Sequence, residues 1–143
     1  MNSILSLLGL AKKAGRLEIG EEPVGAAARA RDARLILLAS DAAENTVRRA
    51  GHFAEAGACL LAQIPASKEA LGSAVGRTSC AMLAVTDIGF ADAVGKKLAA
   101  LDAAKYSALS EKLSVKAARA KERKNEQARH DKNLRTGKKR FKK

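Results

Sequence analysis

The N-terminal part of the chain begins with the pattern of an amphipathic helix. Over residues 3–14, apolar side chains recur three and four positions apart and share one helical face: Ile4, Leu7, Leu8 and Ala11. Gly15 ends this helix, and residues 16–20 then alternate in a way that predicts a very short strand. A second helix is expected from Glu21 to about Arg31, because acidic residues and a proline favour a first helical turn.

Three continuous apolar runs follow and predict strands that are buried on both faces: residues 34–39, 58–62 and 80–85. Helical segments separate them. The first opens at Glu44 or Asn45 and ends at Gly57. A short helix should use Ser67 as its N-cap, and another should follow Asp87 as far as Leu101. Alternating strands and helices predict an α/β sandwich around a small sheet, parallel or mixed.

The C-terminal part differs in composition from the rest. Beyond residue 102 the leucines thin out to Leu109 and Leu113, so we expect a helix to about residues 125–130 and disorder after it. The formal net charge is +12, and residues 116–143 hold 13 Lys/Arg against 3 Asp/Glu. Such a basic terminal block is typical of proteins that meet a polyanion, nucleic acid first and anionic membrane second. A solubilising tail is the alternative interpretation.

The sequence offers little for catalysis or metal binding. Cys59 and Cys80 lie in apolar runs without metal-binding or redox spacing, so buried free thiols are expected. No apolar run approaches the roughly 18 residues of a membrane span, and no signal peptide is seen, so a cytoplasmic location is expected. Asp41 and Asp87 follow predicted strands and could form a carboxylate pair for acid–base or Mg²⁺ chemistry. Helix N-capping is the commoner role of such aspartates, and we expect no enzyme.

Five motifs occur in an order that resembles a known family. They read GLA-x-KAG-x-L-x-x-G at 9–20, RLILLASDA-x-x-NT at 34–46, LG-x-AVG at 71–76, AVTD at 84–87 and GFA at 89–91. Over about residues 4–98 the chain resembles the ribosomal protein L7Ae superfamily, and within it the bacterial YlxQ-like subgroup. The resemblance implies a three-layer α/β/α sandwich with a four-stranded mixed sheet. It also implies binding to structured RNA, typically kink-turns, with no cofactor, metal, small-molecule substrate or catalysis.

The resemblance places the RNA contacts at the start of the second helix and in the loop before the last core strand. The candidates there are Gly20, Glu21, Glu22, Gly76, Arg77, Thr78 and Ser79. Charges assigned by position alone are Lys13, Arg16 and Arg29, and the phosphate contacts of the tail are Lys138, Lys139 and Arg140. In kink-turn binders, three positions at this helix start carry Asn or Lys, then Glu or Gln, and then Lys. In this chain the same positions hold Glu22, Pro23 and Ala26.

These observations predict two parts, an RNA-binding domain over residues 1–98 and a basic helix with a disordered arm over residues 99–143. The leading hypothesis is non-catalytic binding of rRNA or another structured RNA, with the ribosome as one candidate location. In it the domain recognises shape and the tail binds phosphate. The alternative is a ribosome-assembly or translation-associated protein–protein adaptor with non-specific RNA affinity, favoured by the near-neutral residues 1–115 and by the acidic Glu21 and Glu22.

Overall fold

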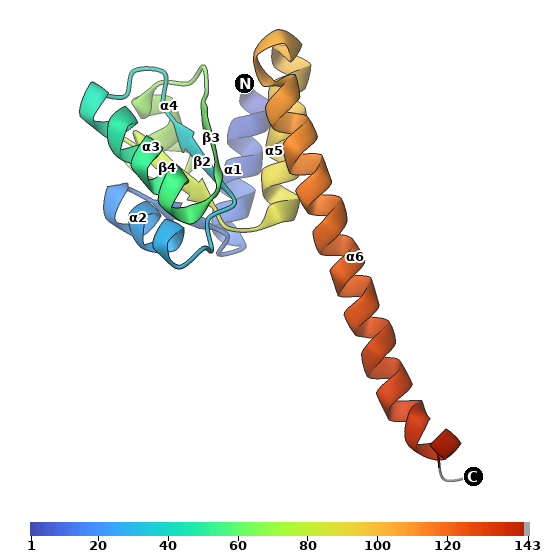
Figure 1. Cartoon of the computed structure of the whole chain (residues 1–143). Coiled ribbons are helices and arrows are strands. Elements are labelled where there is room, and N and C mark those ends of the chain that lie inside the picture. Colours follow the sequence, from blue (N-terminus) through green and yellow to red (C-terminus); the bar gives the residue numbers. More distant parts are fainter. Residues whose placement is uncertain (142–143) are drawn as a thin grey trace.

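The computed structural model describes the backbone of residues 1–141 and the side chains of residues 1–134. Helices and strands alternate along this part of the chain (Figure 1). In order they are α1 (Asn2–Lys13), β1 (Leu17–Ile19), α2 (Glu21–Arg29), β2 (Leu35–Leu38), α3 (Glu44–Gly57), β3 (Leu60–Gln63), α4 (Lys68–Ala74), β4 (Met82–Val85), α5 (Ile88–Leu101) and α6 (Ala103–Phe141). The expected alternation is confirmed, with element ends within a few residues of the predicted ones before α6.

The four strands form one mixed sheet in the order β1-β4-β2-β3. β2 and β3 run parallel, with Leu35 opposite Leu60, whereas β4 is antiparallel to both β1 and β2. The two central strands are buried along their whole length, as continuous apolar runs predict. The expected small four-stranded mixed sheet is therefore confirmed.

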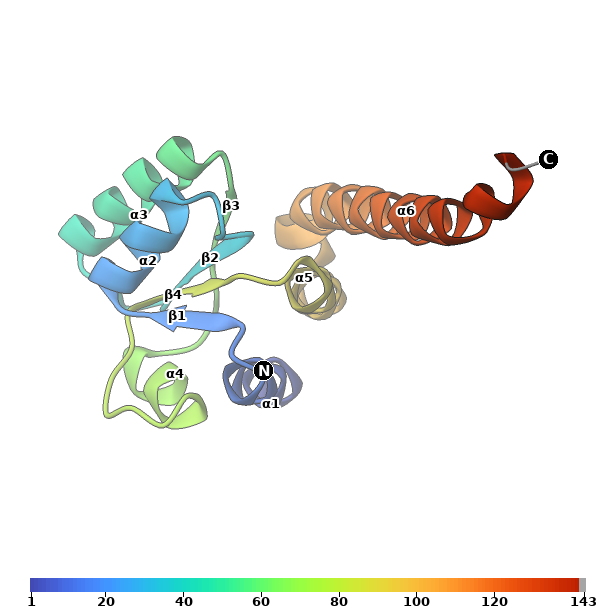
Figure 2. The same cartoon turned by 90° about the horizontal axis from the view of Figure 1, so that it is seen from below.

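Two hydrophobic cores lie on the two faces of the sheet, beneath the helices that cover each face in Figure 2. One face is covered by α2 and α3, and its core includes Val24, Ile36 and Ala50. Helices α1, α4 and α5 pack on the other side, where Leu8, Leu71 and further apolar residues meet the sheet. This arrangement is the three-layer sandwich that the resemblance implied.

The strand expected over residues 58–62 lies further along the chain and is only partly buried. Ala58 takes a left-handed conformation, with φ at 50°, and ends α3 instead of starting a strand. β3 then runs along one edge of the sheet with a strand neighbour on one side, so Leu60 and Leu61 are half-buried. The prediction of a fully buried strand was wrong, because an apolar run alone does not distinguish an edge strand from a central one.

The aspartates considered as a catalytic pair both accept hydrogen bonds from helix starts. Asp87 caps α5, because its Oδ2 accepts a hydrogen bond from the Phe90 N–H at 2.9 Å. Asp41 Oδ1 accepts one from the Lys68 N–H at 2.8 Å, at the start of α4 and not of α3, the helix that follows it. The capping prediction is confirmed for Asp87, and Ser67 caps α4 as expected.

The first turns of α6 belong to the core of the sandwich. Tyr106 and Leu113 are buried, and the Tyr106 hydroxyl donates a hydrogen bond to the Gln63 carbonyl at 2.7 Å. A Cβ at Gly95 of α5 would lie 2.6 Å from Leu113 Cδ1, so the absence of a side chain there lets the two helices approach closely. The Ser114 hydroxyl adds a hydrogen bond to Asp92 at 3.0 Å.

Beyond these turns α6 leaves the sandwich as one continuous helix (Figure 1). Our expectation that the helix ends near residues 125–130 was wrong, because it continues to Phe141. Residues 103–141 contain no proline and one glycine, Gly137, and are rich in Ala, Lys and Arg, which have high helix propensity. Gln127 and Asp131, four residues apart, add a side-chain hydrogen bond at 2.9 Å. Among the described residues, no helix combines the length and apolar character that crossing a bilayer requires.

Candidate nucleic-acid interface

The start of α2 has a backbone geometry that favours glycine. Gly20 precedes the helix with φ at 99° and ψ at 162°, a conformation that side chains strongly disfavour. Its N–H donates to the Met82 carbonyl at 3.0 Å, which fixes the helix start against the beginning of β4. No side chain caps the helix, so the N–H groups of Glu21 and Glu22 are the donors that a helix start offers to an acceptor. Pro23 has no N–H, so the third residue of the helix provides no donor.

The two glutamates at this helix start have different surroundings. Glu21 Oε2 lies 2.6 Å from Arg49 Nη1 of α3, and its Oε1 accepts a hydrogen bond from the Thr46 hydroxyl at 3.2 Å. Glu22 is exposed in the first turn of the helix. The ion pair reduces the negative charge that α2 presents to a phosphate, and the sequence alone gave no signal of this pairing across 28 residues.

The second predicted segment, residues 76–79, forms an exposed loop between α4 and β4. Gly76 has φ at 74°, and the loop folds back so that the Ser79 N–H nitrogen lies 2.7 Å from where a Cβ at Gly72 would be. The loop is followed directly by the start of β4, where Met82 receives the hydrogen bond from Gly20. The fold therefore brings the end of this loop to the same end of the sheet as the start of α2 (Figure 2).

The charges assigned by position alone are scattered. Lys13 lines a hollow of about 550 Å³ between α1 and the end of α4, together with Gly76. Arg29 lies in the last turn of α2, at the opposite end of that helix from Gly20. Arg16 precedes β1, and its carbonyl accepts a hydrogen bond from the Thr86 N–H just after β4. Lys13 is thus placed with Gly76 of the loop, and Arg16 shares a hollow with Pro23 and Ala26 near the start of α2.

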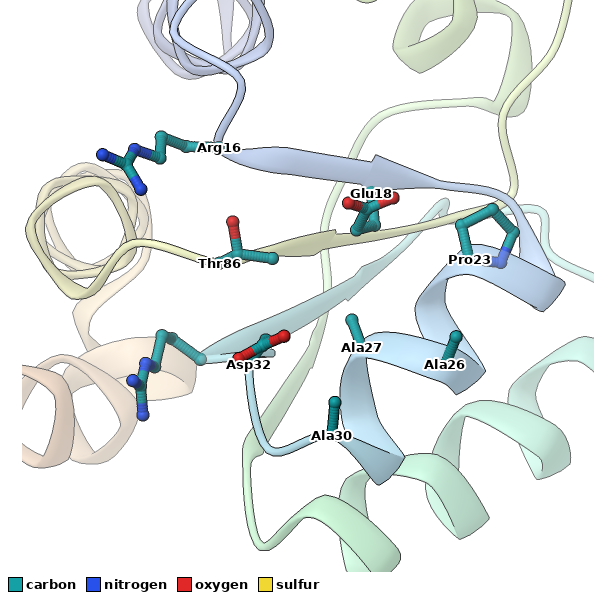
Figure 3. A pocket seen from close by; sticks show the side chains of 9 residues that line it. Arg16, Glu18, Pro23, Ala26, Ala27, Ala30, Asp32 and Thr86 are labelled. Carbon is teal, nitrogen blue, oxygen red and sulfur yellow. The ribbon is translucent and has the colours of Figure 1, made fainter.

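Arg16 borders another hollow, of about 520 Å³, between α2 and the strands β1 and β4 (Figure 3). Figure 3 shows alanines of α2 along one wall and the guanidinium of Arg16 pointing away from that helix. Two cations and two carboxylates line it, which leaves no net charge: Arg16, Arg34, Glu18 and Asp32. Such a lining favours neither an anion nor a cation.

A third hollow, also of about 520 Å³, separates α6 from the end of the sheet at which β2 begins. We call it the α6 groove. It is lined by Gly57, Ala58, Cys59, Ile88, Ala33, Ala120 and five cationic residues, Arg31, Arg34, Lys116, Arg119 and Arg123. No carboxylate occurs among the described residues that line it. We had not singled out these cations, although the spacing of residues 116, 119 and 123 indicates a shared helical face.

Both thiols have a raised pKa. Burial is the main cause for Cys59, whose pKa the nearby Lys116 ammonium pulls partly back down. Burial also raises the pKa of Cys80, which donates a hydrogen bond to the Met82 carbonyl at 3.4 Å. Both cysteines are free, and Cys80 is buried as predicted, whereas Cys59 is only half-buried because it precedes the edge strand β3. Within the described part of the chain, no three His, Cys, Asp or Glu side chains gather in a way that could hold a metal ion.

The tail residues of the prediction fall in the last turns of α6. Lys138, Lys139 and Arg140 have side chains that lie outside the described residues. Their assignment as phosphate contacts stays a prediction, as does the RNA contact of each residue near α2 and the 76–79 loop.

Comparisons with known proteins agree with this fold. The model of the ribosomal protein L7Ae/L30e/S12e/Gadd45 family matches residues 2–95. The chain is 34% identical over 90 residues to the RNA-binding protein YlxQ of Bacillus subtilis (strain 168), covering 60% of this chain and 85% of that protein. It is also 34% identical to a solved structure of a protein with unknown function from Bacillus halodurans C. That similarity has a TM-score of 0.59 and covers 68% of this chain and 94% of the solved one.

The family match begins at α1 and ends within α5, so it contains the whole sheet, the start of α2 and the loop before β4. Helix α6 lies outside it. Because the match spans well over half of the chain and the sheet has the architecture that the motifs implied, this protein belongs to the ribosomal protein L7Ae/L30e/S12e/Gadd45 family.

Proposed function

We propose that this protein binds structured RNA without catalysing a reaction, with shape recognition by the sandwich and phosphate binding by α6. The observation that carries the proposal is the charge of α6 and the residues after it. Residues 116–143 hold 13 Lys/Arg against 3 Asp/Glu, and most of them follow one another along a single helix. A rod of positive charge attracts a polyanion, and the name of the relative from Bacillus subtilis supports RNA as that polyanion.

The start of α2 supports a part for the sandwich in recognition. Its first N–H groups can donate to phosphates or base edges, and Gly20 allows a backbone to approach closely. Because bent RNA elements are recognised through their shape and their splayed bases, a helix start beside an exposed loop suits such a target. A kink-turn or a related sharply bent element of rRNA is the finer form of this proposal.

The side chains at this helix start make the sandwich a weak binder by itself. Glu22 is an exposed carboxylate, Pro23 removes a donor, and Ala26 offers no charge. Affinity must therefore come mainly from elsewhere, and α6 is the part of the chain that provides it. This division predicts binding that falls steeply with salt and a preference among RNAs that is set by the sandwich.

Gel-shift titration tests the proposal with a kink-turn RNA and with the same RNA after its sheared G·A pairs are replaced. Tighter binding of the intact kink-turn supports shape recognition. Equal affinities would remove the kink-turn assignment and leave general RNA binding. No binding of either RNA at low salt would overturn the proposed function.

Deletion of residues 116–143 tests the adaptor alternative. Residual preference for the kink-turn in the deleted chain supports a sandwich that reads RNA by itself. If all RNA binding disappears, the sandwich is not an autonomous reader. The near-neutral surface with Glu22 at the start of α2 would then favour docking on a protein.

A further inference from the structure

We propose that the α6 groove is a second RNA-binding site, which holds the phosphodiester backbone at the end of the sheet opposite the start of α2. The inference rests on the proposed function, because it takes RNA as the ligand. It adds a place for the contact, between the docked part of α6 and residues 31–34, and an RNA-binding role for five cations that the sequence analysis did not assign as RNA contacts.

Among the described residues no carboxylate lines the groove, although Arg34 also borders the neighbouring hollow that Glu18 and Asp32 line. Five cations line the groove, and among the side chains of residues 1–134 none of them forms an ion pair with a carboxylate. The C-terminal end of α3, at Gly57 and Ala58, does border the groove. A helix C-terminus carries only about half a negative charge, so it offsets a small part of five positive ones. The cations repel one another until an anion enters.

The walls of the groove are fixed before any ligand binds. Lys116, Arg119 and Arg123 share one face of α6, three to ten residues beyond the buried Leu113. Leu113 packs against Gly95, and Tyr106 holds the same helix to the end of β3. The opposite wall is equally constrained, because the Arg34 N–H donates to the Val85 carbonyl at 2.8 Å. The backbone positions of the cations are therefore set before binding, so only their side chains have to be ordered when a phosphate backbone binds.

The chemistry of the lining favours a phosphate backbone over other anions. Four of the five cations are arginines, whose planar guanidinium groups match the oxygen pairs of a phosphate. The remaining lining residues are small or apolar and offer no side-chain donors or acceptors that could read base edges, apart from the thiol of Cys59. Binding should therefore be independent of sequence and of the kink-turn geometry.

The two RNA-facing surfaces lie at opposite ends of the same strand. Arg34 precedes β2, whereas the other end of β2 lies beside the start of β4, to which Gly20 is bonded. Four strand residues span about 13 Å. One folded RNA could thus contact both ends, with its bent element at α2 and a flanking backbone segment in the α6 groove.

Two triple variants that remove the same charge test the groove. Lys116→Gln/Arg119→Gln/Arg123→Gln changes the groove wall, and Lys121→Gln/Lys124→Gln/Arg129→Gln changes exposed cations of α6 that do not line it. Glutamine keeps a high helix propensity in both. We expect the groove triple to weaken binding of the kink-turn RNA about tenfold more than its matched control. It should also lower the slope of log K against log salt by about 2–3 in magnitude, since each phosphate contact contributes about 0.7–0.9.

The G·A-replaced RNA and a variant of the opposite wall sharpen this test. The groove triple should weaken binding of both RNAs by the same factor, because its contacts do not depend on the kink. Arg34→Gln should weaken binding more than Arg48→Gln, which removes an exposed cation of α3 outside the groove. Circular dichroism melting of every variant establishes that the fold is retained.

Equal losses of RNA affinity in the two triple variants would overturn the proposal that the α6 groove binds RNA and would leave the proposed function intact. Absence of RNA binding by the full chain would overturn both. If millimolar inorganic phosphate fills the groove, seen by shifts of the arginine side-chain resonances, while the two triples bind RNA equally, the groove is a small-anion site. The assignment to RNA is then wrong.

Discussion

The start of α2 and the α6 groove lie at opposite ends of the sheet and differ in what they offer to RNA. At α2 the geometry is specialised and the charge is small: Gly20 has a conformation that favours glycine, and Glu21 is paired with Arg49. The α6 groove has the opposite balance: five cations line it, and its backbone includes Arg31 and Ala58, two non-glycine residues with positive φ. Our proposal therefore assigns shape recognition and electrostatic affinity to different regions, and the second region includes a helix outside the family match.

The α6 groove exists only while α6 stays docked on the sandwich. Its docking depends on packing against α5, where Leu113 is buried, and on the hydrogen bonds of Tyr106 to β3 and of Ser114 to α5. The start of α2, by contrast, is fixed by the sheet itself through the hydrogen bond from Gly20 to Met82. The two regions should therefore respond differently to mutation.

Leu113→Ala should have the largest effect on stability. Leu113 is fully buried against Gly95, and truncation of a buried leucine costs about 2–5 kcal/mol of unfolding free energy. Urea denaturation measures this loss, and RNA affinity should fall with it as the groove wall loosens. Leu134→Ala, on the exposed part of α6, should change stability by less than about 0.5 kcal/mol. Similar small losses for both variants would mean that α6 is not docked.

Gly20→Ala should have an intermediate effect and should act on the other region. The conformation of Gly20 is strained for alanine by about 1–3 kcal/mol, so stability and the preference for a kink-turn should both fall. The salt dependence of RNA binding should be unchanged, because Gly20→Ala does not alter the α6 groove. Gly51→Ala is the control: it lies inside α3 with open space around its Cβ position and should stabilise by up to about 1 kcal/mol. A Gly20→Ala protein that keeps its stability and its kink-turn preference would contradict the part given to this helix start.

Glu21→Gln should have the smallest effect and opposite signs for the two properties. The Glu21–Arg49 pair is partly exposed, with side-chain exposures of 36% and 64%, so its loss should cost less than about 1 kcal/mol. RNA affinity should rise about two- to threefold, because Arg49 is released and a carboxylate is removed near the backbone. Isothermal titration at low salt measures the gain. Glu111→Gln, an exposed site on α6, controls for net charge, and an equal gain there would remove the local explanation.

Much of the fold was predictable from local patterns, and the groove was not. The apolar stripe of α1, the short strand β1 and the caps at Ser67 and Asp87 are local signals, and the structure confirms them. The displaced β3 was missed because the left-handed Ala58 is an alanine and gives no turn signal. The full length of α6 was missed because the high charge of its residues predicts disorder, whereas the same residues have a high helix propensity.

The candidate site divides in the same way. The start of α2 and the 76–79 loop follow from motifs that lie in order along the chain. The ion pair of Glu21 and the α6 groove depend on contacts between distant segments, residues 21 and 49 in one case and residues 31–34 and 116–123 in the other. Only the docked position of α6, set by Tyr106 and Leu113, brings the second pair of segments together.

The salt dependence of RNA binding, measured for the full chain and for a chain that ends at Arg123, tests the account most directly. If about 6–8 cations meet phosphates, log K should fall against log salt with a slope of about −5 to −7 for the full chain. The shortened chain keeps the α6 groove, so its slope should remain at about −2 to −4. A slope near zero for the full chain, or equal slopes for the two chains, would contradict the account.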